Sequence, residues 1–269
     1  MGGRHFRRNP VFWLDIRARL RERRLWMLAL FMLAIPAAIS ILALCNGDMK
    51  PSGIAETGMI LAGIAVFSHG ALLVLLSALA AAQRISQERE RRTLPALVNS
   101  PMTASQIANG KLLGAWLFVL WLSCATLPFL AIASAWGGLP LATLLLCWTL
   151  NTLAAFAAGS LALGLSGLFG RSLSAYLASG AVLFLWCAVV PIVGLVGSLG
   201  FKEMPPSLYF AAFFNHLPLA PQAYLFAGAD SSIRDGFPAV QIATAVAAWL
   251  AIAAVGRFLA IRGLRREIL

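Results

Sequence analysis

The residues of this chain best suited to a specific task lie together in residues 83–111, QRISQERERRTLPALVNSPMTASQIANGK. This segment is the longest stretch that is not predominantly apolar, and it lies between two long uncharged segments. Leu94, Leu97 and Val98 are spaced along one face of a helix, next to the charges of the run ERERR. A short helix that is apolar on one side and rimmed with charge is suited to docking into a groove on a soluble partner.

The same segment predicts where its helices begin and end. Glu88 and Arg92 are four residues apart, in the acid-first order that stabilises a helix through an ion pair. Pro101 ends the leucine-rich turn, and Thr103 with Gln106 forms a capping-box pattern. We therefore expect a new helix to begin at Thr103 and to continue into an apolar span.

Patterns typical of catalysis, cofactor binding or metal binding are missing from the sequence. It has no GxxxxGK[ST], HExxH or GxSxG, and no close pair of carboxylates within a span. The four cysteines are scattered singly, as expected of small apolar residues inside spans. His69, deep in an uncharged stretch, is a functional candidate as an ionisable group in a membrane, although a neutral histidine bonded to a neighbouring helix is the commoner arrangement. We expect no catalytic, cofactor or metal site in this chain.

Composition places the chain in a membrane. Of its 269 residues, 60% are hydrophobic and only 12% are charged, whereas soluble domains are roughly 25% charged. The net charge of +11 comes from basic clusters that flank hydrophobic stretches, not from one binding face. That distribution reports membrane topology and contact with anionic lipid head groups, and it gives no reason to expect nucleic acid as a partner.

We expect an all-α polytopic membrane protein with six transmembrane helices. The predicted order is a cytoplasmic amphipathic surface helix in residues 1–24, six spans in residues 25–257 with a cytoplasmic coupling loop at 83–111 between the second and third, an external re-entrant helical hairpin at 200–236, and a basic cytoplasmic tail at 258–269. The spans themselves are predicted at residues 25–44, 57–82, on both sides of a turn at 136–140, at 172–196 and at 237–256.

The distribution of positive charge decides between six spans and seven. With six spans and both termini inside, only Lys50, Lys202 and Arg234 of the 21 Lys and Arg residues lie outside. If residues 204–229 also spanned, the arginine-rich tail would move outside. That segment contains four prolines, which fit a re-entrant pair of short helices better than a continuous span.

Small residues concentrate in the predicted fourth and fifth spans. They are Gly159, Ser160, Gly164, Gly167 and Gly170, followed by Gly194, Gly197 and Gly200. Residues of this kind allow helices to approach closely. They serve either packing within this chain or a dimer interface, and both alternatives stay open.

The coupling-loop segment resembles that of one family of transporters. Residues Glu88, Arg89, Glu90, Thr93, Leu94, Leu97, Ser100, Pro101, Gly110 and Lys111 follow the order found between the second and third spans of membrane subunits of the ABC transporter type-2 permease family. The pattern is close to ERE-x-G-T, a leucine-rich turn, a Ser-Pro pair and a Gly-Lys that opens the next helix. The chain departs from it at Arg92, where the family usually has a small residue.

The resemblance implies a set of partners and site residues. The partners are separately encoded ABC ATPase subunits that hold ATP and Mg, a second permease copy or a paralogue, and membrane lipids; this chain would bind no cofactor itself. The residues expected to couple it to the ATPase are Glu88, Arg89, Glu90, Thr93, Leu94, Leu97, Val98 and Pro101. Asp15 and Glu22 of the surface helix are expected to pair with Arg84 or Arg89.

The second and fifth spans line the cavity in the family, so that Phe67, His69, Tyr176 and Trp186 are candidate lining residues. The sequence therefore favours the permease subunit of an ATP-driven exporter of lipidic or hydrophobic cargo, multi-pass in a bacterial inner membrane. Two alternatives remain. A membrane-embedded enzyme acting on lipid would need convergent polar groups at one depth, and a non-transporting anchor or assembly factor would leave the ordered loop unexplained.

Overall fold

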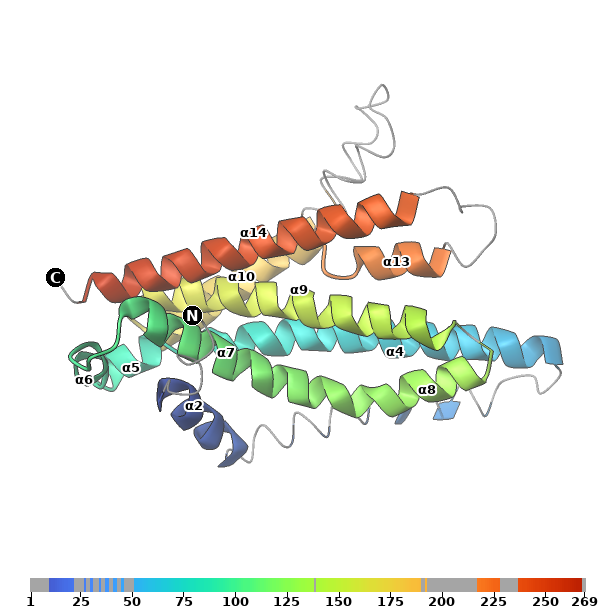
Figure 1. Cartoon of the computed structure of the whole chain (residues 1–269), viewed down its shortest axis with the longest axis horizontal. Coiled ribbons are helices and arrows are strands. Elements are labelled where there is room, and N and C mark those ends of the chain that lie inside the picture. Colours follow the sequence, from blue (N-terminus) through green and yellow to red (C-terminus); the bar gives the residue numbers. More distant parts are fainter. Residues whose placement is uncertain are drawn as a thin grey trace, which may run out of the picture.

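Every element of the described structure is a helix, in agreement with the all-α prediction (Figure 1). The computed structural model describes residues 10–21, 51–137, 139–189, 217–227 and 237–267, together with single positions between 27 and 45 and at 192. About two thirds of the predicted first span at residues 25–44 therefore lies outside the described residues.

Among the described residues, four helical stretches are long and apolar enough to cross a membrane. They contain α4 (Pro51–Ala81), continued by α5 (Ser86–Glu90); α7 (Ala104–Ser123) with η1 (Cys124–Thr126) and α8 (Leu127–Ala135); α9 (Leu141–Leu168); and α14 (Phe237–Arg265). These stretches match the second, third, fourth and sixth predicted spans. The fifth is represented by α10 (Ser172–Phe184) and the π-helical turn η2 (Leu185–Val189), an apolar stretch that is shorter in its described part.

The third span contains a break whose backbone is satisfied by side chains. Pro128 lies in the first turn of α8, and η1 joins α8 to α7. The carbonyl of Ser123 accepts hydrogen bonds from the Thr126 hydroxyl at 2.7 Å and from the indole of Trp148 on α9 at 3.1 Å. Irregular backbone is tolerated inside a membrane when protein groups satisfy it in this way.

Helix α9 lies between α4 and α14, and small residues bring the three helices into backbone contact. A Cβ built on Gly164 would lie 2.5 Å from the carbonyl oxygen of Gly256 on α14, and one on Gly159 would lie 2.4 Å from the hydroxyl oxygen of Ser77 on α4. Ser160 also donates a hydrogen bond to the carbonyl of Ala253 at 2.7 Å. These residues therefore serve packing within the chain.

The other small residues of the same prediction differ in their surroundings. Gly167 likewise lies against the backbone of α14, whereas a Cβ added at Gly170 would meet nothing within 4 Å among the described residues. Gly194, Gly197 and Gly200 lie outside the described residues.

Helix α2 (Pro10–Arg21) lies within the segment predicted as a surface helix and packs on α7. Val11 and Phe12 are buried, whereas Trp13, Leu14 and Arg17 are exposed. The helix is thus two-sided, with a covered apolar side and an outer side that mixes apolar and basic groups.

Two predicted boundaries are corrected. Helix α4 begins at Pro51, six residues before the predicted start of the second span at residue 57, because proline is well suited to the first turn of a helix. Helix α14 continues beyond Gly256 to Arg265, so the predicted tail at 258–269 is largely helical. Arginine is a good helix former, and positive charge in the last turn interacts favourably with the helix dipole.

The predicted re-entrant segment at residues 200–236 is described only at 217–227. There a turn at 217–219 precedes the eight-residue helix α13 (Ala220–Ala227). A continuous span through residues 204–229 is not formed, because the chain turns at Pro218. Helix α13 is too short to cross a membrane and lies beside α14 and α9.

Candidate functional site

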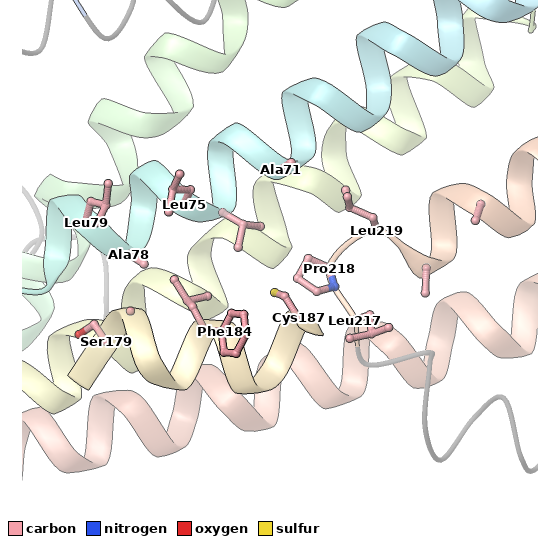
Figure 2. Close-up of a pocket in the computed structure, with 15 residues that line it drawn as sticks. Ala71, Leu75, Ala78, Leu79, Ser179, Phe184, Cys187, Leu217, Pro218 and Leu219 are labelled. Carbon is pink, nitrogen blue, oxygen red and sulfur yellow. The ribbon is translucent and has the colours of Figure 1, made fainter. Parts of the chain in front are cut away.

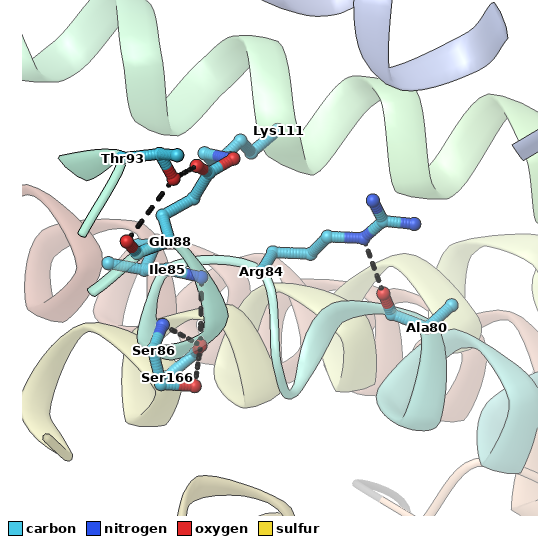
Figure 3. Close-up of polar contacts among 8 residues, drawn as sticks. All are labelled: Ala80, Arg84, Ile85, Ser86, Glu88, Thr93, Lys111 and Ser166. Carbon is cyan, nitrogen blue, oxygen red and sulfur yellow. Dashed lines mark hydrogen bonds and ion pairs between the residues drawn. The ribbon is translucent and has the colours of Figure 1, made fainter. Parts of the chain in front are cut away.

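The candidate site is the loop end of the bundle, where α5, α6 (Leu94–Val98) and the start of α7 meet the ends of α9 and α14 (Figure 1). Helix α5 starts on a group supplied by α9. The backbone amides of Ile85 and Ser86 donate to the hydroxyl oxygen of Ser166 at 3.0 and 3.1 Å (Figure 3). Ser86 and Ser166 are fully buried. A hydroxyl from another helix thus satisfies amides that a helix start leaves without partners.

Glu88, the first of three successive charged residues on α5, is bound to α7. Its carboxylate accepts a hydrogen bond from the Lys111 ammonium at 3.0 Å and another from the Thr93 hydroxyl (Figure 3). The Lys111 side chain is only 4% exposed and that of Glu88 is 33% exposed. Because a buried ammonium needs a counter-charge, Glu88 is what makes the position of Lys111 tolerable.

Arg89 caps the carboxyl end of α9. Its guanidinium donates to the carbonyl of Phe169, to that of Gly167 at 3.3 Å, and to the carboxylate of Glu267 at 2.9 Å. Terminal carbonyls carry the negative end of the helix dipole, so a cation is favoured there. Arg89 pairs with Glu267 in the described structure. The predicted pairing of Asp15 and Glu22 with Arg84 or Arg89 stays a prediction, because the side chains of those two acids are not described.

Glu90 binds the amino end of α10. Its two carboxylate oxygens accept hydrogen bonds from the backbone amide of Ser172, at 2.8 Å, and from the Ser172 hydroxyl. A carboxylate is favoured at this end of a helix because the free amides carry partial positive charge. Arg89 and Glu90 therefore bracket the turn between α9 and α10, each with the charge that the helix end it touches prefers.

Both carboxylates stay ionised at neutral pH. The uncharged part of the α4 stretch ends at Gln83, so α5 lies beyond the part suited to the membrane interior. Hydrogen bonds from the side chain and the backbone amide of Ser172 hold the pKa of Glu90 below its ordinary value. Partial burial raises the pKa of Glu88, but the hydrogen bond from Thr93 and the charge of Lys111 outweigh burial and leave this pKa lowered.

Arg92 adopts the left-handed backbone conformation, with φ 57°. The amide of Thr93 donates to the carbonyl of Glu88 at 2.9 Å, and the amide of Arg92 donates to that of Arg89 at 3.1 Å. This pair of bonds is a Schellman motif, in which the left-handed position is usually glycine. The family's small residue has its physical reason here, and the predicted helix pair of Glu88 with Arg92 is wrong because the helix has already ended.

The apolar side of α6 faces the chain's own core. Leu94 is buried, and Leu97 and Val98 pack against the large core cluster. The exposed residues of this region are Arg91, Arg92, Thr93, Pro95, Ala96 and Asn99. A partner at this end would therefore meet arginines and small residues, not the leucine face that the sequence suggested for docking.

The start of α7 agrees with its prediction. The hydroxyl oxygen of Thr103 accepts from the amide of Gln106 at 3.2 Å, and the Gln106 side chain accepts from the amide of Thr103 at 2.9 Å. This is the expected capping box. Pro101 lies in the turn between α6 and α7, so that the predicted stop is also present.

An apolar cavity of about 670 Å³ lies between α4 and α10 (Figure 2). Its third wall is the turn and first residues of α13. The lining residues are Ala71, Val74, Leu75, Ala78 and Leu79 of α4, Ser179, Gly180, Leu183, Phe184 and Cys187 of α10 and η2, and Leu217, Pro218, Leu219, Ala220 and Ala223. Almost all of these side chains are hydrocarbon, so the cavity suits an apolar ligand.

The four residues predicted to line a cavity do not line this one. Phe67 packs on Phe226 with ring centroids 5.4 Å apart. His69 and Trp186 are buried at 2% and 7% exposure, and Tyr176 packs half-buried against the core. The second and fifth predicted spans, α4 and α10, do form walls of the cavity. The residues of these helices that line it are different from the predicted ones.

His69 belongs instead to a buried polar cluster. The side-chain amide of Asn151 on α9 donates to the carbonyl of Val66 at 3.0 Å and lies 3.4 Å from Nδ1 of His69. The side chains of Asn151 and Gln222, on α13, lie 2.6 Å apart. Sequence analysis did not single out Asn151 and Gln222, because each is an isolated polar residue in an apolar run. The cluster favours the neutral, hydrogen-bonded interpretation of His69.

The described residues hold no group of three or more His, Cys, Asp and Glu side chains that could bind a metal ion. What the loop end offers is mechanical connection, since one five-residue helix is bonded to α7, α9, α10 and the turn that follows α14.

In comparisons with known proteins, the family described as "ABC-2 family transporter protein" matches residues 9–266. No curated protein matches the chain. The family match covers nearly the whole chain and confirms the resemblance drawn from residues 88–111.

Proposed function

The chain belongs to the ABC-2 family of transporter proteins, and on this premise we propose that it is the permease subunit of an ATP-driven ABC exporter. A separate ATPase subunit hydrolyses ATP with Mg, and this chain turns the ATPase movement into movement of cargo. The observation that carries the proposal is the bonding of α5, whose residues 88, 89 and 90 each hold a different part of the bundle.

In this arrangement the ATPase displaces α6, and α5 passes the displacement on to the helices of the bundle. The two helices are joined by the turn at Arg91 and Arg92, and the leucine face of α6 rests on the core. A displacement of α5 must either break its bonds to Glu267, Lys111 and Ser172 or carry the attached helices with it. Because these bonds are charge-assisted and reach both ends of the α9–α10 turn, we infer that α10 moves relative to α9.

The chemical class of the cargo is inferred from the lining of the cavity. It lies between α4, which leads directly into α5, and α10, whose amino end is held by Glu90. A shift of α10 therefore changes the width of the space between Leu75 and Phe184. Since the lining is almost entirely hydrocarbon, the cargo is lipidic or otherwise hydrophobic, and it leaves the membrane or crosses it outward.

The remaining parts of the proposal follow from six-span topology and the incomplete enclosure offered by one chain. Two permease copies, or this chain and a paralogue, pair and recruit two ATPase subunits. The loop end faces the cytoplasm, where both termini also lie, and the protein resides in a bacterial inner membrane. Helix α2 lies along the membrane surface, with Trp13 and Arg17 suited to the head-group layer.

The test is purification of the tagged chain from its native membranes in mild detergent, followed by ATPase and transport assays in reconstituted membranes. A stoichiometric ATPase is expected to co-purify. Glu90→Ala should leave assembly intact and lower the cargo moved per ATP, whereas Glu56→Ala, an exposed acid at the far end of α4, should change neither.

Two results would contradict the proposal. A clean absence of any ATPase would favour a non-transporting membrane anchor or assembly factor. Loss of the Glu90→Ala protein from the membrane would show that Glu90 serves folding and not transmission.

A further inference from the structure

The acids of the loop end are bound within the chain, whereas two of its arginine side chains are not. Glu88, Glu90 and Glu267, the described acids of this end, all accept hydrogen bonds from other parts of the chain, and Glu90 and Glu267 are also exposed. Arg89 is turned inward. The negative charge of this end is thus already engaged by groups of the chain itself.

Arginines outnumber acids on the exposed surface of this end. Arg91, Arg92, Arg171, Arg262, Arg265 and Arg266 are all exposed. The guanidinium groups of Arg91 and Arg92, on the α5–α6 turn, form no hydrogen bond or ion pair with the described residues, although Arg91 lends some positive potential to Glu88. Unpaired guanidinium groups at the rim of an interaction surface steer and hold an oppositely charged partner.

The backbone of Arg92 is a second, independent indication that its side chain is used. A non-glycine residue in the left-handed conformation is strained relative to glycine, and glycine would complete the same Schellman motif without that strain. Strain of this kind at an exposed turn is a reason to look for a function of the side chain. The Arg92 guanidinium forms no hydrogen bond or ion pair with the described residues that would offset the strain.

The place of these arginines favours a soluble protein partner over lipid. They follow the end of the uncharged α4 stretch by eight and nine residues, and they adjoin α6, the outermost helix at this end of the bundle (Figure 1). Next to them on α6, the exposed side chains of Pro95 and Ala96 are small. The surface is thus a narrow ridge with two cations at its root, which fits a groove better than a flat layer of head groups.

We propose that the ATPase subunit receives α6 in an acidic groove whose carboxylates pair with Arg91 and Arg92. This inference rests on the proposed function and adds the chemistry of the contact. Leu94, Leu97 and Val98 anchor α6 to the core of the chain. Arg91 and Arg92 attract the acidic groove of the ATPase. The complex is consequently expected to weaken as ionic strength rises.

The experiment measures the affinity of the purified ATPase for the permease in nanodiscs at low and high ionic strength. Arg91→Glu/Arg92→Glu reverses both charges and keeps the same kind of residue at the left-handed position. It should weaken binding by at least about tenfold, because two ion pairs are replaced by two repulsions. Arg262→Glu/Arg265→Glu is the matched control, with two exposed arginines reversed on α14, and its affinity should stay within about twofold of the unmodified chain.

A second variant guards against a folding defect. Arg91→Gln/Arg92→Gly removes both charges and places glycine where the backbone prefers it. It should be at least as stable as the unmodified chain, bind the ATPase about threefold or more weakly, and lose most of the salt dependence.

Three results would overturn the inference. Unchanged affinity of both Arg91 and Arg92 variants, or binding that is insensitive to salt, would exclude an acidic groove. An effect seen only in nanodiscs that contain phosphatidylglycerol, and not in phosphatidylcholine alone, would assign the arginines to lipid. An unmodified chain that retains no ATPase at all would refute the proposed function itself, an outcome distinct from loss of binding in the variants alone.

Discussion

Gly256→Ala tests the close contact of α9 and α14 on which the bundle depends. A Cβ at residue 256 would lie 2.3 Å from the carbonyl oxygen of Ser160 and 2.5 Å from the amide nitrogen of Leu161. Both atoms belong to the backbone of α9, so no side-chain rotation relieves the clash. The helices must separate by about 1 Å to restore ordinary contact.

The magnitude follows from two opposing terms. Alanine in place of glycine stabilises an exposed helix interior by roughly 0.5–1 kcal/mol. Overpacking a tight contact costs typically 1–3 kcal/mol, and separation also stretches the 2.7 Å hydrogen bond from Ser160 to Ala253. Gly180→Ala on α10, where a Cβ meets nothing within 4 Å, keeps only the first term. The two variants should therefore differ by about 1–3 kcal/mol in unfolding free energy.

The assay is reversible unfolding in detergent micelles, followed by circular dichroism or by tryptophan fluorescence, to which Trp249, buried on α14, contributes. The unfolding free energy of Gly256→Ala is expected to be lower than that of the unmodified chain. That of Gly180→Ala is expected to be equal or higher. Equal stability of the two variants would refute the backbone contact between α9 and α14, because only that contact distinguishes them.

Three further predictions concern single interactions. Glu88→Gln should lower stability by about 1–3 kcal/mol, since Lys111 is left buried without its carboxylate, and Lys111→Met in the same chain should recover most of the loss; strictly additive thermal-unfolding effects would argue against the pair. Arg92→Gly should raise the melting temperature, because it relieves left-handed strain of up to about 1 kcal/mol, and a lower melting temperature would contradict the Schellman geometry. Asn151→Leu should speed amide hydrogen exchange in α13 by leaving Gln222 without its partner, at a cost of about 0.6–2 kcal/mol, and unchanged exchange would show that the amide contact does not hold this helix.

The order of the elements could largely be predicted, because the length of an apolar run and the charges at its ends are properties of the local sequence. The uncharged run on each side of residues 136–140 predicts two helices, and the prolines around Pro218 predict a break where the chain does turn. The predicted edge of the last span at residue 256 does not coincide with the end of α14, because a change from apolar to basic residues marks the edge of a membrane and not the end of a helix. Arg262 and Arg265 continue the same helix.

The site was predictable in its location but not in its connections. The order of Glu88, Arg89 and Glu90 marked the segment, yet Lys111, Glu267 and Ser172, which bind these residues, are 23 to 178 positions away and are brought close by tertiary packing. The pairing of Glu88 with Arg92 failed because a local rule assumes a helix that continues. The leucine spacing showed that α6 has an apolar face, but periodicity does not say whether that face meets a partner or the chain's own core.

The measurement that tests the central claim most directly is photo-crosslinking from Ala96, an exposed residue of α6, in intact membranes with and without ATP. A photoreactive side chain there should form a nucleotide-dependent crosslink to an ATPase subunit, while the same group at Trp121, an exposed position within the α7 stretch suited to the membrane, should label lipid. The same yield of lipid adducts from both positions, with no crosslinked ATPase, would contradict the account.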